Sequence, residues 1–235
     1  MYQAILFDID DTLYSYQEAN VQTMPLVADY VHRELGVERE PFLSLYARCM
    51  EEQLRSHSDV AGCHSRAIRF QMVLERLKKP LCHAAVLNDL YWNSFLNVMK
   101  PFPHMVECLR TLCAMGLRMG VCSDMTTDWQ LKKLQRLGVL ELLDFVVTSE
   151  EAGVEKPHPD IFRLCAQKAE CEAGECLFIG DNLNKDVRGA QGVGMHALWF
   201  QPEGGAAAEI PDVRSIQDFQ GLIDHINNLK KEYVP

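Results

Sequence analysis

The chain has 235 residues, of which 48% are hydrophobic, and its formal net charge is −10. This length and apolar content suffice for one sizeable core, alone or with an inserted lobe. The negative charge excludes a bulk electrostatic attraction to nucleic acid or to an anionic membrane, so we expect neither as a partner.

The first predicted element is a short buried strand at residues 4–7, AILF. It ends directly in three acids, Asp8, Asp10 and Asp11. Carboxylates held this close raise one another's pKa or need a cation between them. The end of the first strand therefore predicts a site that uses several carboxylates together.

The segment that follows, residues 14–98, contains no strand-like apolar run. Its apolar residues recur instead at helical spacing, as they do at Phe42, Leu45, Tyr46 and Cys49. We therefore predict that this segment is an all-helical insert.

Beyond the insert, short apolar runs alternate with helical patterns, and a closing helix is predicted near residues 215–230. The apolar runs cover residues 117–122, 145–147, 176–179 and 197–200, and the helical patterns cover 104–115, 129–137 and 159–169. Alternating strands and helices form a parallel sheet that is covered on both faces. We predict an α/β fold with a doubly wound, Rossmann-like parallel sheet core at residues 1–14 and 98–235 and an all-helical cap domain at residues 15–97.

Polar side chains follow four of the predicted strands. After the acids of the first strand, Ser123 and Asp124 follow the second apolar run, Lys156 lies in the loop after the third, and Asp181 and Asp186 follow the fourth. Ligands of an open parallel sheet bind at the carboxyl ends of its strands. We therefore expect these side chains to meet at one edge of the sheet.

The cysteines and the N-terminal segment bear on the cellular compartment. Nine cysteines are dispersed without a Cys-x-x-Cys pair, which is typical of free thiols. No basic N-terminal region precedes an apolar segment, and no apolar run approaches membrane-spanning length. We expect a soluble cytoplasmic protein, and the pattern indicates no particular oligomeric state.

Taken in order, the four polar groups resemble the motifs of the haloacid dehalogenase superfamily. The first motif matches Asp8-Ile9-Asp10-Asp11-Thr12, the second Ser123, the third Lys156, and the fourth the spacing from Gly180-Asp181 to Asp186. The resemblance extends over essentially the whole chain, and the helical insert is similar to the type-1 cap of subfamily I. It implies a Mg²⁺-dependent phosphatase of small phosphorylated metabolites. Sugar phosphates or nucleoside monophosphates would be the substrates, as in the N-acylneuraminate-9-phosphatase and 5′-nucleotidase-like members.

The resemblance also implies roles for the acids. Asp8 would attack phosphorus and form an aspartyl-phosphate, and Asp10 would exchange protons with the leaving group and with water. Such a division of labour requires a higher pKa at Asp10 than at Asp8. The carboxylates of Asp8 and Asp181 and the backbone carbonyl of Asp10 would hold Mg²⁺, with support from Asp186. Thr12 would fix the turn, and an N-terminal helix cap is the alternative role for Asp186.

The remaining motif residues would bind the substrate. Lys156 would neutralise the phosphate and the nucleophile, and Ser123 would bind phosphoryl oxygens. The alternatives are that Lys156 is a solvated loop residue and that Ser123 caps the following helix. Asp124 is a candidate substrate contact, with a turn or cap residue as the favoured alternative.

A basic cluster in the insert is the candidate for binding the part of the substrate beyond its phosphate. It comprises His57, His64, Arg66 and Arg69. Arg66 and Arg69 are three residues apart and would share a helix face. A solvated face is the favoured interpretation. The alternative is contact with a carboxylate or a second anionic or hydroxyl-rich group of the substrate.

Three other functions are compatible with this fold. A haloacid dehalogenase needs the nucleophile but neither the metal nor the acid two residues later, whereas Asp10, Asp181 and Asp186 are all present. A phosphomutase must protect its intermediate from water, and no sequence feature indicates that property. A catalytically silent binding protein would be favoured by loss of a motif residue, and none is lost.

Overall fold

The computed structural model describes residues 2–56, 60–202 and 210–232. Its centre is a six-stranded sheet with the order β3-β2-β1-β4-β5-β6, and every pair of neighbours is parallel. The strands are β1 (Ala4–Phe7), β2 (Arg118–Ser123), β3 (Phe145–Thr148), β4 (Cys176–Gly180), β5 (His196–Phe200) and β6 (Ser215–Ile216). The predicted doubly wound α/β fold is confirmed, although the two-residue strand β6 was not predicted.

Strand order reverses beside β1, because the chain goes to β2 and β3 on one side and to β4, β5 and β6 on the other. Phe7 is paired with Val121 of β2 and with Ile179 of β4. This register brings the residues that follow these three strands to the same edge of the sheet. Ligands bind at such a switch point in open parallel sheets.

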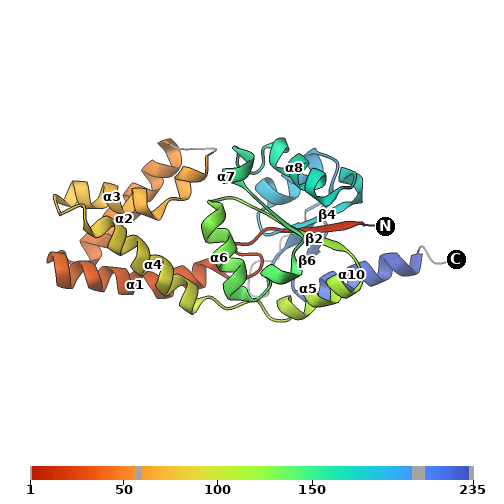
Figure 1. Cartoon of the computed structure of the whole chain (residues 1–235), viewed down its shortest axis with the longest axis horizontal. Helices are drawn as coiled ribbons and strands as arrows, with labels where there is room; N and C mark the ends of the chain where they lie inside the picture. Colours follow the sequence, from red (N-terminus) through yellow and green to blue (C-terminus); the bar gives the residue numbers. More distant parts are fainter. Residues whose placement is uncertain (1, 57–59, 203–209, 233–235) are drawn as a thin grey trace.

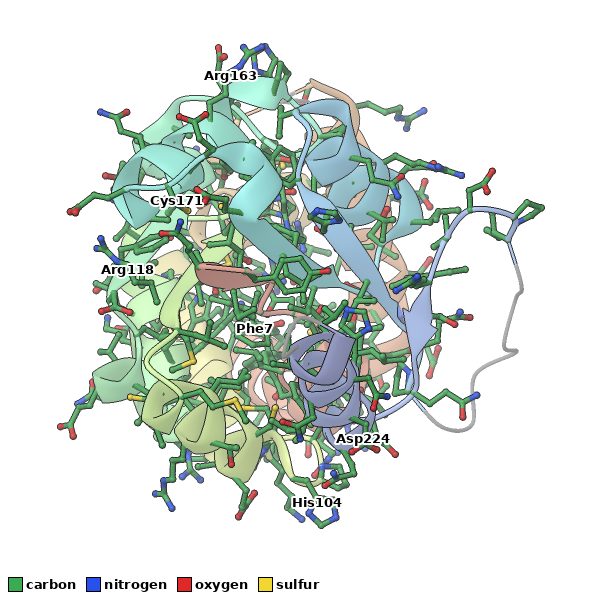
Figure 2. The ribbon with its side chains drawn as sticks, turned by 90° about the vertical axis from the view of Figure 1, so that its right-hand side faces the viewer. Phe7, His104, Arg118, Arg163, Cys171 and Asp224 are labelled. Carbon is green, nitrogen blue, oxygen red and sulfur yellow. The ribbon has the colours of Figure 1, made fainter. Side chains whose placement is uncertain are left out.

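Helices cover both faces of the sheet. They are α5 (Met105–Ala114), α6 (Thr127–Leu137), α7 (Ser149–Ala152), α8 (Pro159–Ala169), α9 (Gly189–Gly192) and α10 (Phe219–Glu232), with short 3₁₀-helices at Leu140–Leu142 and Ala173–Glu175 and a π-helix at Leu183–Arg188. Ile5 and Phe7 of β1 pack in the core on the α5, α6 and α10 side, while Ala4 and Leu6 pack on the α8 side. Viewed from the end opposite the insert, Figure 2 shows Arg163 of α8 and Asp224 of α10 on opposite sides of Phe7.

The insert consists of helices, as predicted. They are α1 (Tyr16–Leu35), α2 (Arg39–Ser56), a short helix at Ala61–His64, α3 (Arg66–Leu77) and α4 (His83–Val98). They lie together beyond one end of the sheet, on the left of Figure 1. Trp92 of α4 stacks on Trp129 of α6 with ring centroids 4.5 Å apart, which joins the insert to the core. Within the described residues, no helix has both the length and the apolar character needed to cross a membrane.

Candidate active site

A cavity of about 150 Å³ lies at the carboxyl ends of the central strands. Its lining comprises Asp8, Asp10, His64, Ser123, Asp124, Met125, Lys156, Asp181, Asn182, Lys185 and Asp186. The structure thus brings together the strand-end residues that the sequence predicted to meet. A larger hollow of about 410 Å³ beside Phe102, Phe200 and Phe219 contains none of these strand-end residues.

Asp8 and Lys156 form the centre of the cavity. Lys156 Nζ lies 2.6 Å from Asp8 Oδ1 and 2.6 Å from Asp186 Oδ1, and all three residues are buried. Burial raises the pKa of Asp8, the Lys156 ammonium opposes that rise, and the neighbouring Asp186 and Asp181 add to it. Burial lowers the pKa of Lys156, but the two carboxylates outweigh this and raise it. The alternative of a solvated loop lysine is therefore wrong.

Three acids lie close enough to share one ion. Oxygen atoms of Asp8, Asp181 and Asp186 all lie within 4.8 Å of one another. Burial, followed by the field of Asp186, raises the pKa of Asp181 to about 7. Three neighbouring carboxylates with one lysine between them repel one another, and a hard divalent cation that prefers oxygen ligands would relieve this repulsion. The donor set is therefore suited to Mg²⁺.

Hydrogen bonds hold these acids in place. Thr12 Oγ1 accepts from Asp181 N at 3.1 Å and lies 3.4 Å from Asp181 Oδ1 and 3.5 Å from Asp8 Oδ2. Asp186 Oδ2 accepts from Asn182 N at 2.9 Å. Asn182 is itself the residue that caps the turn at Leu183–Arg188, so the helix-cap alternative for Asp186 is wrong.

Asp11, which had no predicted role, does not line the cavity. Its backbone is left-handed, with φ of 59°, and its carboxylate accepts from Tyr16 N at 2.8 Å. Asp11 therefore directs the chain from β1 into the first helix of the insert.

Asp10 is held by a lysine that the sequence analysis missed. Lys133 Nζ of α6 lies 2.7 and 2.8 Å from the two carboxylate oxygens of Asp10, and the Tyr14 hydroxyl donates to Oδ1. Burial would raise the pKa of Asp10, but Lys133 and Tyr14 together lower it. The structure therefore gives the reverse of the expected order, because the pKa of Asp8 is raised and that of Asp10 is lowered. The sequence does contain one sign that Lys133 is buried, because it lies four residues from both Trp129 and Leu137, on the apolar face of its helix.

Ser123 and Asp124 position other groups in the cavity. Ser123 Oγ accepts from Gln130 Nε2 at 2.9 Å, and the cap of α6 is Thr126, so Ser123 is not a helix cap. Asp124 accepts from Lys156 N at 2.9 Å and pairs with Lys185 Nζ at 2.8 Å. Asp124 therefore fixes two cationic residues. Lys185 was also missed, although it lies between Asp181 and Asp186 in the fourth motif.

The two arginines of the basic cluster, Arg66 and Arg69, do not line the cavity. Arg69 is 2% exposed and donates to Gln53 Oε1 at 3.0 Å and to the Tyr46 hydroxyl at 3.2 Å. Arg66 is 6% exposed and lies over the rings of Tyr91 and Trp92, at 5.3 and 5.4 Å. The favoured solvated face is therefore wrong, because both guanidinium groups are buried against aromatic rings.

His64 is the described residue of the insert that lines the cavity. Its Nε2 lies 3.0 Å from Glu155 Oε1 in the core loop that precedes Lys156. His57, from the same basic cluster, lies outside the described residues.

Comparisons with known proteins agree with this geometry. The family model of the haloacid dehalogenase-like hydrolases matches residues 2–194. A ribulose-1,5-bisphosphate 5-phosphatase of Halopiger xanaduensis is 36% identical over 206 residues, which is 86% of each chain. A glyceraldehyde 3-phosphate phosphatase of Methanocaldococcus jannaschii is 29% identical over 99% of this chain and 100% of its own.

Among solved structures, a HAD phosphatase from Thermococcus onnurineus is similar, with a TM-score of 0.72 and 27% identity over 96% of this chain and 98% of its own. A 2-haloacid dehalogenase from Pseudomonas syringae has a TM-score of 0.74 over 97% of this chain and 100% of its own, but at 24% identity it shows the fold alone. The family match and the phosphatase relatives agree with the strand-end site. The chain therefore belongs to the haloacid dehalogenase-like hydrolase family, as an enzyme of its phosphatase branch.

Proposed function

We propose that this protein is a Mg²⁺-dependent phosphatase that hydrolyses small sugar phosphates through an aspartyl-phosphate on Asp8. The observation that carries the proposal is the contact of 2.6 Å between Asp8 and Lys156 beside the cluster formed with Asp181 and Asp186. A phosphate monoester and a carboxylate nucleophile repel each other, so attack requires this positive charge.

The chain's own residues divide the reaction. Asp8 attacks phosphorus, Lys156 neutralises charge on the nucleophile and on the phosphoryl oxygens, and Ser123 binds one of those oxygens. Asp8, Asp181 and the Asp10 carbonyl, with Asp186 in support, would hold Mg²⁺, which would supply further charge neutralisation.

Asp10 lines the same cavity with 30% of its side chain exposed. Lys133 keeps Asp10 ionised, which suits it to accept a proton from the water that hydrolyses the intermediate. Protonation of the leaving group by Asp10 would have to compete with that ion pair.

The size of the cavity supports a small substrate. About 150 Å³ holds a phosphoryl group with a short carbon chain. The relatives named above are phosphatases of a five-carbon and a three-carbon sugar phosphate. We take residues 15–97 as a cap that closes over the strand ends, excludes water and contributes His64 to the substrate site.

The likeness to the dehalogenase from Pseudomonas syringae does not favour the dehalogenase alternative, because an identity of 24% shows the fold alone. A dehalogenase also has no use for the acidic cluster of Asp8, Asp181 and Asp186. We therefore retain a single proposed function.

Turnover of glyceraldehyde 3-phosphate and of p-nitrophenyl phosphate, with Mg²⁺ and with EDTA, tests the proposal. Asp8→Asn should abolish turnover and the labelled phosphoenzyme, and Asp181→Ala should abolish the response to Mg²⁺. Asp160→Asn is the matched control, because Asp160 is an exposed acid paired with Arg163 on α8. Full activity in EDTA, or labelled phosphate retained by Asp8→Asn, would refute the mechanism.

A further inference from the structure

A second cluster of metal-ligating side chains joins the insert to the core beside the catalytic cavity. Cys63 and His64 belong to the short helix Ala61–His64 of the insert, and Glu155 belongs to the core loop before Lys156. Cys63 Sγ lies 3.4 Å from Glu155 Oε1, and His64 Nε2 lies 3.0 Å from the same oxygen. One donor atom from each of the three residues lies within 4.8 Å of the other two.

One hydrogen bond, donated by the Cys63 thiol to Glu155 Oε1, contributes to this arrangement, but none involves His64 Nε2. His64 Nε2 is buried, and despite its distance of 3.0 Å from Glu155 it has no hydrogen-bond partner. Cys63 is 3% exposed and Glu155 8% exposed, so both are removed from water as well. A buried ring nitrogen and a carboxylate this close, without a hydrogen bond, are oriented as two ligands of one ion would be.

The distances agree with a shared ion. Zinc binds sulfur at about 2.3 Å and nitrogen or oxygen at about 2.0–2.2 Å, which places tetrahedral ligand atoms roughly 3.3–3.7 Å apart. The observed separations of 3.0 and 3.4 Å differ from this by a few tenths of an ångström.

We propose that Cys63, His64 and Glu155 form a binding site for Zn²⁺ or a similar borderline-soft divalent ion, separate from the acidic site of Asp8. The mixed sulfur, nitrogen and oxygen set selects such an ion, whereas the all-oxygen set of the catalytic site selects Mg²⁺. Three protein ligands leave the fourth position of a tetrahedral ion to water. The proposal does not depend on the phosphatase activity.

The charges balance on binding. Burial, and next the field of Glu155, raises the pKa of the Cys63 thiol to about 12, so the sulfur is protonated before the ion binds. Binding breaks the S–H bond, releases the proton to solvent and forms the bond from sulfur to the ion, without any redox change. The thiolate and Glu155 then carry two negative charges against the two positive charges of the ion. Lys185, 3.5 Å from Glu155 Oε2, keeps its shorter contact of 2.8 Å with Asp124.

The site has a mechanical consequence, because its ligands come from both sides of the cavity mouth. An ion held by Cys63 and His64 from the insert and by Glu155 from the core would tether the two parts. It would also fix the orientation of His64, which lines the catalytic cavity.

Titration of the reduced, full-length protein with Co²⁺ in excess Mg²⁺ tests the site, since Mg²⁺ occupies the all-oxygen cluster. We expect a thiolate-to-cobalt charge-transfer band in the wild type that Zn²⁺ displaces. Cys63→Ser should lack the band while retaining Mg²⁺-dependent turnover of p-nitrophenyl phosphate, which shows that the variant is folded. Cys171→Ser is the matched control and should keep the band, because Cys171 contacts Cys176 at 3.4 Å and does not belong to the cluster of Cys63, His64 and Glu155.

His64→Ala and Glu155→Gln test the other two ligands. Each should weaken Co²⁺ binding by about 100-fold or more, since losing even an outer-shell partner weakens a site by roughly 10–100-fold. Absence of the band in the wild type, its persistence in Cys63→Ser, or unchanged affinity in both of these variants would overturn the proposal.

Discussion

The ion pair between Lys133 and Asp10 gives the sharpest prediction about stability. The Lys133 side chain is 0% exposed, and its ammonium lies 2.7 and 2.8 Å from the two oxygens of Asp10. It also lies 5.5 Å from the ring centre of Trp92. Lys133→Met keeps the apolar stem of the side chain and removes the charge, so it isolates the electrostatic contribution.

The expected loss can be bounded from the structure. Removing one partner of a buried ion pair costs about 3–5 kcal/mol, and a charge-assisted hydrogen bond contributes about 1.5–3 kcal/mol. Asp10 retains 30% exposure of its side chain and the hydrogen bond from Tyr14, so solvent offsets part of the loss. We expect Lys133→Met to lower the free energy of unfolding by about 2–3 kcal/mol, or Tm by roughly 5–10 °C.

Urea unfolding of the metal-free protein measures this loss, and Lys132→Met is the matched control. Lys132 is the exposed neighbour in an i,i+4 pair with Asp128 and should cost only about 0.3–0.5 kcal/mol. The double variant with Asp10→Asn should recover part of the loss, because no unpaired charge remains. Equal losses for Lys133→Met and Lys132→Met, or strict additivity with Asp10→Asn, would refute the reasoning.

The stabilisation that the Asp10–Lys133 pair gives to the folded state depends on pH in a defined direction. Lys133 and Tyr14 lower the pKa of Asp10 below 3.8 in the folded state. The stabilisation is therefore complete above about pH 4 and declines as the pH falls through the folded pKa.

Three further predictions concern the cavity and the insert. Gly180→Ala would place a Cβ 2.4 Å from Asp186 Oδ2 and displace that carboxylate, so turnover should fall by about 100-fold. Gly174→Ala is the control and should be neutral, because a Cβ there would meet no atom within 4 Å. Equal kcat values for the two variants would contradict this prediction. Arg66→Met should lower Tm, because it removes the hydrogen bond from Arg66 Nη1 to His64 O at 2.7 Å and the contacts with the Tyr91 and Trp92 rings, but it should not raise KM for glyceraldehyde 3-phosphate; a raised KM at unchanged Tm would instead place Arg66 in the substrate site. Because the pKa of Asp181 is raised from 3.8 to about 7, the metal-free protein should lose stability as the pH rises through that interval. The increase in Tm from EDTA to Mg²⁺ should then be larger near pH 8 than near pH 5, and melting curves that show equal increases would argue against the acidic cluster.

Much of the fold and of the cavity could be predicted because the signals are local. Apolar runs of three to six residues that alternate with helical periodicity specify a covered parallel sheet, whatever the rest of the chain does. The carboxyl ends of parallel strands meet at one edge, so the acids after β1 and β4 had to lie together with Ser123. Strand β6 was not predicted, because a run of two residues is too short to show a periodic pattern.

The charged partners could not be predicted in the same way. A charged residue in a helical pattern is by default assigned to solvent, and its burial depends on a partner that sequence spacing does not reveal. Asp10 and Lys133 are 123 residues apart, and Arg66 is buried against aromatic rings from another helix of the insert. Burial raises the pKa of Asp8, whereas Lys133 and Tyr14 lower that of Asp10, so the order of the two pKa values is the reverse of the expected one.

The sequence by itself thus determined the sheet, the helical insert and which acids, serine and lysine meet at the strand ends, since each depends on patterns within a few residues. Only the tertiary structure decided that His64 rather than the arginines of α3 reaches the cavity, and that Lys133 and Lys185 hold its acids. It also brought Cys63 and His64 of the insert against Glu155 of the core. These are contacts between segments distant along the chain, and packing of the insert on the core creates them.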